Sequence, residues 1–175
     1  DLHLSLRRQR QMCIRDRYFA DAGQYIENRL LVDHAVPNCR SNVLYKGALQ
    51  GDKASKLPEA RTCWVGDVLI RAEAKGTDTY ETNRNLVLTD GARADAIPNL
   101  EIETGEIAGA GHAATVGRFD DDQLFYLRSR GIREEDATRL IIRGFFNEVL
   151  NQIPVESIRE ELIARVAGEL ERNEN

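Results

Sequence analysis

The sequence predicts a β-rich part of about a hundred residues followed by a helical part of about fifty-five. Residues 18–115 contain short apolar runs typical of β-strands, separated by Gly, Asn, Asp and Pro. After Gly117 the pattern changes to amphipathic helix. With 175 residues and 42% hydrophobic content, the chain can form one sizeable core with an appendage, or two small domains.

The β-type runs begin roughly 10–22 residues apart. Such spacing suits a β-sandwich, or a solenoid whose coils of roughly 20 residues stack on one another. Alternation of inward and outward residues does not separate these two folds. The runs are NRLLVDHA (28–35), SNVLYKGAL (41–49), CWVGDVLIRAEA (63–74), TYETNRNLVLT (79–89), DAIPNLEIET (95–104) and EIAGAGHAATV (106–116).

Three helices are expected after the junction. The first is DQLFYLRSRG, for which Asp120–Asp122 supply an N-cap and an acidic first turn, and Gly131 a stop. The second, residues 134–153, has Ala137, Leu140, Ile141, Phe145 and Val149 on one face, widened by Ile142, Phe146 and Leu150. The third, residues 155–172, has a narrow apolar face.

The first seventeen residues differ in charge from the rest. They hold five arginines and two aspartates, whereas the whole chain carries a net charge of −5. The stretch RRQRQMCIRDR (7–17) can be interpreted as a basic nucleic-acid arm, a solvated helical face or a non-biological scar. It resembles a translated sequencing-library adapter, because the adapter codons CGT CGG CAG CGT CAG ATG TGT ATA AGA GAC encode residues 7–16. We therefore expect residues 1–17 to be non-native and to lack stable packing, and the natural chain to begin before this fragment.

Several functions are disfavoured. The acidic balance argues against nucleic-acid binding, and no apolar run approaches the ~20 residues that cross a bilayer. No secretion signal is present, so a cytoplasmic protein is expected. Cys13, Cys39 and Cys63 lack metal-site or disulfide spacing, and are interpreted as buried or free thiols.

Few residues suggest chemistry. His34 and His112 have no partner at metal-ligand spacing, and no phosphate loop, nucleophile elbow or dinucleotide motif occurs. Catalysis by this chain alone is therefore not indicated. The segment FYLRSRGI (125–132) mixes aromatic and arginine side chains of the kind that anchor interfaces, which suggests a surface for a partner.

Longer motifs carry a family resemblance. HAVPNCRSNVLYKGAL, TYETNRNLVLTDGARADAIPNLEIE, GHAATVGRFDDDQLFYLRSRGI and GFFNEVL occur in this order. Together they resemble the C-terminal half of the SufB/SufD family of iron–sulfur cluster assembly proteins, from about Tyr18 to about Leu170. The resemblance implies a right-handed parallel β-helix, here partial and covering residues 18–116, followed by a small helical domain, residues 117–175.

Two positions place the chain on the SufD side of the family. SufB-like chains carry a cysteine in YTQCDS and a glutamate in HEAT, where this chain has Asn83 and Ala113. A SufD-like chain pairs with SufB through the β-helix and docks the ATPase SufC through the helical domain, with no nucleic acid or membrane as partner. The resemblance implies no stably bound cofactor, a nascent iron–sulfur cluster shared with SufB, and allows a flavin in the complex.

The resemblance also implies site residues. His112 corresponds to a histidine at the SufB interface, where it can ligate iron or a nascent cluster; many relatives add a cysteine at the position of Ala110. The SufC-binding residues are expected to be Phe125, Tyr126, Arg128, Arg130, Gly131 and Phe146, although Phe146 could instead be core. Two alternatives stay open: a SufB-like scaffold that itself carries the cluster, and a stand-alone β-helix enzyme. This chain lacks the cysteine and glutamate that a SufB-like scaffold would carry. It also lacks the array of carboxylates that a β-helix enzyme would need.

Overall fold

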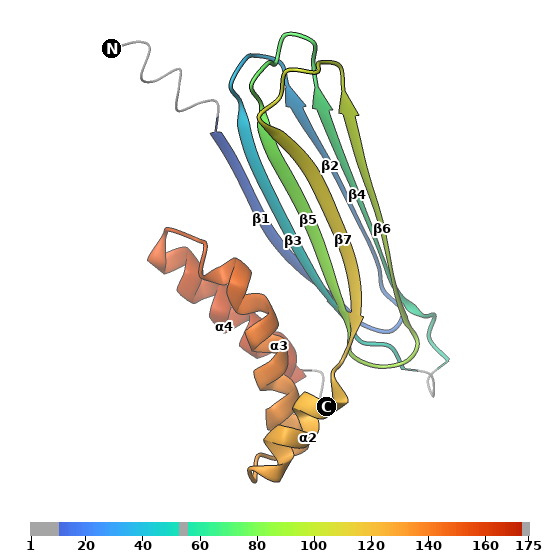
Figure 1. The fold of residues 1–175 in the computed structure, drawn as a ribbon. Coiled ribbons are helices and arrows are strands. Elements are labelled where there is room, and N and C mark those ends of the chain that lie inside the picture. Colours follow the sequence, from blue (N-terminus) through green and yellow to red (C-terminus); the bar gives the residue numbers. More distant parts are fainter. Residues whose placement is uncertain (1–10, 53–55, 173–175) are drawn as a thin grey trace. The chain divides into compact units, whose positions relative to one another are not determined.

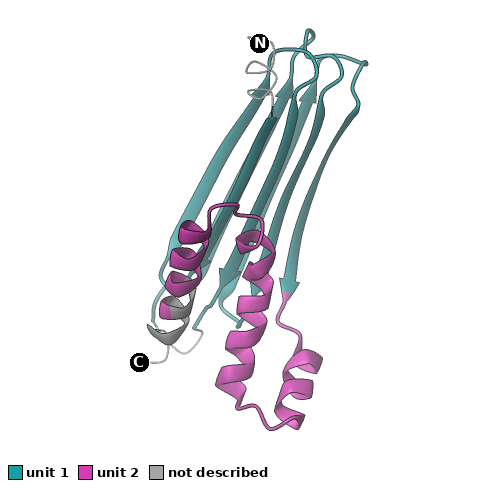
Figure 2. Ribbon diagram, turned by 90° about the vertical axis from the view of Figure 1, so that its left-hand side faces the viewer, with its two compact units in different colours: residues 1–117 teal, residues 118–175 magenta. Residues whose placement is uncertain are grey.

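The chain divides after Gly117 into two compact units (Figure 2). A computed structural model describes residues 11–52 and 56–172 (Figure 1). The division falls at the junction expected from the sequence near Gly117.

The first unit is a parallel β-solenoid. Odd-numbered strands form one sheet, in the order β1-β3-β5-β7, and even-numbered strands form the other, in the order β2-β4-β6 (Figure 1). The pairs β1–β3, β3–β5, β2–β4 and β4–β6 are all parallel. The predicted β-helix is therefore confirmed, and the sandwich alternative is wrong. The strands are β1 Gln11–Ala20, β2 Tyr25–His34, β3 Arg40–Leu49, β4 Ala60–Ile70, β5 Asp78–Val87, β6 Ala92–Ile102 and β7 Gly109–Arg118.

The coils are longer than the expected period of roughly 20 residues. Gln11 pairs with Arg40, 29 positions later, and Arg40 pairs with Asp78, 38 positions later. Each coil contributes one strand of about ten residues to each sheet, together with two turns. The spacing between successive apolar runs in the sequence therefore corresponds to half a coil, because each coil contains two strands.

Residues 11–17 pack against the solenoid, so the expectation that they lack stable packing is wrong. They form most of β1, which pairs in register with β3, and Ile14 packs against the core. Pairing along a sheet edge uses backbone groups that every sequence has, so β3 can recruit whatever chain precedes Tyr18. Residues 1–10 lie outside the described residues, and the adapter origin stays a prediction.

The core of the solenoid lies between the two sheets. Side chains alternate inward and outward along each strand, as β4 shows with buried residues at every second position. Trp64 is fully buried at the centre, with its ring centroid 5.8 Å from that of Tyr45. The buried cluster consists of Tyr18, Val32, Val43, Tyr45, Trp64, Val68, Ile70 and Ala74.

The second unit contains α2 (Asp121–Ser129), α3 (Glu134–Leu150) and α4 (Glu156–Arg172). The Asp120 side chain accepts bonds from the backbone N–H groups of Asp122 and Gln123, as an N-cap should. Gly131 follows α2 with φ of +84°, which favours glycine. No helix among the described residues is both long and apolar enough to cross a membrane.

The buried face of α3 is rotated relative to the sequence prediction. Ala137, Ile142, Phe146, Val149 and Leu150 are buried, whereas Leu140 is exposed and Phe145 is only half-buried. α3 packs against both α2 and α4, so its buried face is set by two neighbours. The helical periodicity of the sequence identified an apolar stripe on α3, but not which residues of the stripe are most deeply buried.

Candidate functional site at the open end of the solenoid

β7 ends the first sheet with an uncovered inner face. In the described part of the chain the second sheet stops at β6, so no strand lies opposite β7. Ala110 on β7 packs against the core. Because side chains alternate, His112, Ala114 and Val116 lie on the same side of the strand, and all three are exposed. The solenoid therefore ends in an open surface that carries one imidazole.

The register of β7 on β5 follows from three contacts. The carbonyl oxygen of Thr77 accepts from the N–H groups of both Ala108, at 2.9 Å, and Gly109, at 3.2 Å; the second bond is the pattern that a Gly109–Asp78 pair gives in a parallel ladder. A Cβ on Gly109 would lie 3.4 Å from Asp78 Oδ1, and a Cβ on Gly111 would lie 2.8 Å from the Tyr80 ring. Counting along both strands from this pair places His112 directly beside Glu81.

Glu81 is a buried carboxyl group. Its side chain is 1% exposed, and neither carboxyl oxygen accepts a hydrogen bond from any described residue. Burial, with a smaller contribution from the charge of Asp67, raises the pKa of Glu81 to about 7. Gly66 leaves it room, since a Cβ there would lie 2.8 Å from Glu81 Oε2 and 2.2 Å from the Trp64 ring. A buried acid with no partner is costly, and such groups often mark functional sites.

Asn83, the next inward residue of β5, belongs to a satisfied polar network. Its side-chain amide donates to the Tyr18 hydroxyl at 3.1 Å, and its oxygen accepts from Asn85 at 2.6 Å. The Tyr18 hydroxyl donates in turn to Asn85 Oδ1 at 2.6 Å. The position where SufB-like chains carry a cysteine is therefore occupied here by a structural amide, which offers no thiol.

The chain itself offers few metal ligands. No group of three or more His, Cys, Asp or Glu side chains in the described ranges could hold a metal ion. His34 is buried with Nε2 3.0 Å from Ser41 Oγ, and burial lowers its pKa, so its role is structural. Cys39 is buried, and its thiol donates to the Val36 carbonyl. An ion at His112 would therefore need further ligands from outside the described residues.

The helical unit exposes an aromatic and basic surface on α2. Phe125 is 73% exposed and Tyr126 is 55% exposed, which is unusual for such large side chains. The Arg130 guanidinium lies 5.0 Å from the centre of the Tyr126 ring, and Arg128 pairs with Glu134 at 3.1 Å. Tyr126 also borders a hollow of about 380 Å³ lined by Asp122, Gln123, Leu127 and Ile141.

Phe146 does not belong to that surface. It is 2% exposed and its ring contacts Phe145, with the ring centroids 5.4 Å apart. It lies on the buried face of α3, so the prediction that it contacts a partner is wrong. The core alternative that the sequence left open for Phe146 is the one observed.

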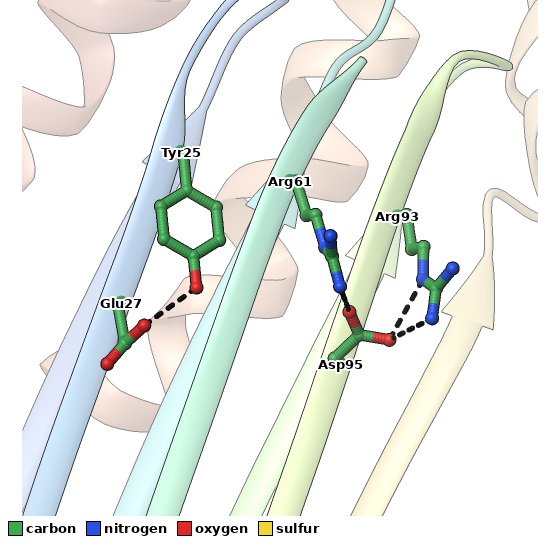
Figure 3. Close-up of polar contacts among 5 residues, drawn as sticks. All are labelled: Tyr25, Glu27, Arg61, Arg93 and Asp95. Atoms are coloured by element: carbon green, nitrogen blue, oxygen red, sulfur yellow. Dashed lines mark hydrogen bonds and ion pairs between the residues drawn. The ribbon is translucent and has the colours of Figure 1, made fainter.

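Polar side chains on the outer face of the second sheet pair both within strands and between them. Figure 3 shows Arg61 on β4 and Arg93 on β6 both bonded to Asp95, at 2.9 Å in each case, while Tyr25 donates to Glu27 on β2. The hydrogen bond from Arg61 is the main cause that lowers the pKa of Asp95. Only the Arg61–Asp95 bond joins two strands, β4 and β6, and the carboxylates of Glu27 and Asp95 are already paired.

Sequence reasoning found His112 but missed Glu81. The available signal was the alternation in TYETNRNLV, which places Glu81 in phase with the inward residues Asn83, Asn85 and Val87. An acidic residue at an inward position is unusual and could have been noted. Its proximity to His112 depends on strand register between coils, which no local pattern reveals.

A solenoid of parallel coils joined to a small helical unit defines the structural class, and comparisons with known proteins define the family. The family described as SUF system FeS cluster assembly, SufBD core domain, matches residues 6–145. The chain therefore belongs to the SufBD family. The match begins at residue 6, inside the proposed adapter segment 1–17. Its start therefore does not coincide with the expected boundary between adapter and natural sequence after residue 17.

Individual relatives agree with this family. The chain is 70% identical over 158 residues to an iron–sulfur cluster assembly SufBD family protein of Mycobacterium bovis, covering 90% of this chain and 40% of that protein. It is 35% identical over 148 residues to the iron–sulfur cluster assembly protein SufD of Escherichia coli, covering 85% of this chain and 33% of that protein. SufD of Bacillus subtilis is 44% identical over 95 residues, covering 54% of this chain and 22% of that protein. The chain thus spans about two-fifths or less of the length of these relatives.

Proposed function

We propose that this chain is part of a SufD-like, non-enzymatic subunit of a cytoplasmic iron–sulfur cluster assembly complex. In this complex it pairs with SufB through the open end of the solenoid and docks the ATPase SufC through α2. One observation carries the proposal: a member of the SufBD family ends its solenoid in an uncovered strand, β7, that presents an exposed imidazole.

An uncovered inner face needs a partner. The exposed Val116 would be buried, and the edge of β7 paired, if a second solenoid continued the sheet. His112 would then lie inside the joint between two proteins, where ligands from SufB could complete a site for the nascent cluster. A neutral imidazole is a suitable ligand for iron. The cluster is cargo in this proposal, and the chain holds no cofactor of its own.

His112→Ala should lower the yield of cluster in the complex reconstituted with SufB and SufC, without loosening the complex. The reason is that the imidazole is a small, exposed part of the face, so its removal deletes a ligand and little contact area. Cluster yield is read from visible absorption and iron content, and assembly from gel filtration. The control Thr115→Ala alters the same strand on its opposite face and should change neither. An unchanged yield in His112→Ala would remove this residue from the site.

Truncation of both exposed aromatic residues of α2, Phe125→Ala with Tyr126→Ala, should weaken SufC binding selectively. Aromatic anchors at interfaces often contribute about 2 kcal/mol or more, roughly a thirtyfold change in Kd. SufB binding and thermal stability should stay unchanged because both rings are exposed. The control is Leu140→Ala, which removes an exposed apolar side chain from α3. Equal SufC affinity in the α2 variant and the wild type would place the docking surface elsewhere.

A further inference from the structure

Glu81 and His112 occupy adjacent positions on one face of one sheet. In register, their Cα atoms are about 4.8 Å apart, and paired residues of neighbouring strands point to the same side. The close approaches of Gly109 to Asp78 and of Gly111 to Tyr80 select this register, and they involve neither the Glu81 nor the His112 side chain. The imidazole at the open end therefore has a carboxyl group as its neighbour in the preceding coil.

None of the described residues donates a hydrogen bond to Glu81. On its other side in the sheet it pairs with Val43 of β3, which has no polar group. From the opposite sheet it meets Gly66, beside the carbon edge of the Trp64 ring. Within the described residues both carboxyl oxygens remain without a hydrogen bond. A structural role in the isolated chain would be served better by an apolar side chain.

We propose that Glu81 is a positioning residue for His112. When a partner covers the inner face of β7, the imidazole turns inward, and one ring N–H donates to the Glu81 carboxyl. This bond fixes which ring nitrogen is protonated and directs the other nitrogen toward the partner. Carboxyl groups commonly orient ligating histidines in this way. The inference rests on the proposed function, because it assigns Glu81 a role through His112.

The geometry can be tested in this chain without any metal or partner. In a background of Cys13→Ser, Cys39→Ala and Cys63→Ser, Glu81→Cys with His112→Cys should form an intramolecular disulfide on mild oxidation. The spacing of paired residues lies within the 4.4–6.8 Å between Cα atoms that disulfides accept. The control combines Glu81→Cys with Ala113→Cys, whose side chain points to the opposite face. Peptide mass spectrometry identifies the bond, and circular dichroism checks the fold. Equal cross-linking in the two variants would overturn the inference.

The role is tested in the complex with SufB and SufC. Glu81→Ala should lower cluster yield roughly tenfold, the lower end of what loss of an orienting carboxylate costs in metal affinity. It should have no further effect when His112→Ala is already present. Glu81→Gln, which keeps an oxygen that accepts the ring N–H, should restore most of the yield.

The two failures can be told apart. If His112→Ala leaves the yield unchanged, the proposed function of His112 is wrong. If His112→Ala lowers the yield but Glu81→Ala does not, or if the two effects multiply in the double variant, only the positioning role is overturned. Gel filtration of each complex verifies that assembly is intact.

Discussion

Trp64→Ala is expected to lower the free energy of unfolding of the solenoid unit by about 3–5 kcal/mol, the range for removing a large aromatic side chain from a core. Trp64 is fully buried and lies among residues of several coils, including Tyr45 and Val68. The small side chain of alanine would leave a cavity between the two sheets. Urea denaturation followed by far-ultraviolet circular dichroism measures the change.

The matched control for this substitution is Leu31→Ala on the outer face of β2. Leu31 is 65% exposed, so its truncation should change the free energy of unfolding by less than about 0.5 kcal/mol. Trp64 is the single tryptophan of the chain, which makes its fluorescence a reporter of the solenoid in every other variant. A loss below about 1 kcal/mol in Trp64→Ala would show that the two sheets do not enclose this ring.

Glu81 should make the stability of the chain fall as the pH rises from about 4.5 to about 7. Its pKa is raised from 4.5 to about 7 in the folded chain. Below pH 4.5 the Glu81 carboxyl is largely protonated in both the folded and the unfolded chain, so its ionisation does not lower the free energy of unfolding. Between the two values the unfolded chain releases the proton while the folded chain retains it, so unfolding becomes more favourable. Above about pH 7 the full penalty, roughly 3 kcal/mol, persists.

Glu81→Gln should abolish this dependence and leave the variant more stable than the wild type at pH 8.5 by roughly 3 kcal/mol. At pH 3.5 the two should be nearly equal, since the Glu81 carboxyl is then almost fully protonated in both the folded and the unfolded state. Urea titrations monitored by Trp64 fluorescence at several pH values provide the comparison. His34, whose pKa is lowered by burial, acts equally in both proteins and cancels in the difference. Glu101→Gln, an exposed carboxyl on β6, is the control. Parallel pH profiles for wild type and Glu81→Gln would contradict the burial of an unpaired acid.

Much of the fold could be predicted because its elements have local signals. The apolar runs correspond to β2 through β7, and Asp120 and Gly131 bound the first helix as expected. The pairing of β1 with β3 was not predictable from side chains, because strands pair through backbone N–H and C=O groups that every sequence has. The coil length was underestimated because sequence runs do not tell to which of two sheets each strand belongs.

The candidate site was predictable only in part. His112 could be singled out by family resemblance, but its exposure follows from the absence of a strand opposite β7 in the described structure. The partnership with Glu81 depends on a register between residues 31 positions apart. Phe146 was misassigned as a partner contact because helical periodicity defines a stripe, whereas the neighbours α2 and α4 decide which part of it is buried.

Co-purification tests the central claim most directly. This chain, immobilised through a tag and verified as folded by Trp64 fluorescence, is mixed with purified SufB and SufC, separately and together. We expect it to retain both proteins, with SufC binding weakened by the α2 aromatic truncations and SufB binding unaffected by them. A folded chain that retains neither SufB nor SufC would contradict the assignment to the assembly complex.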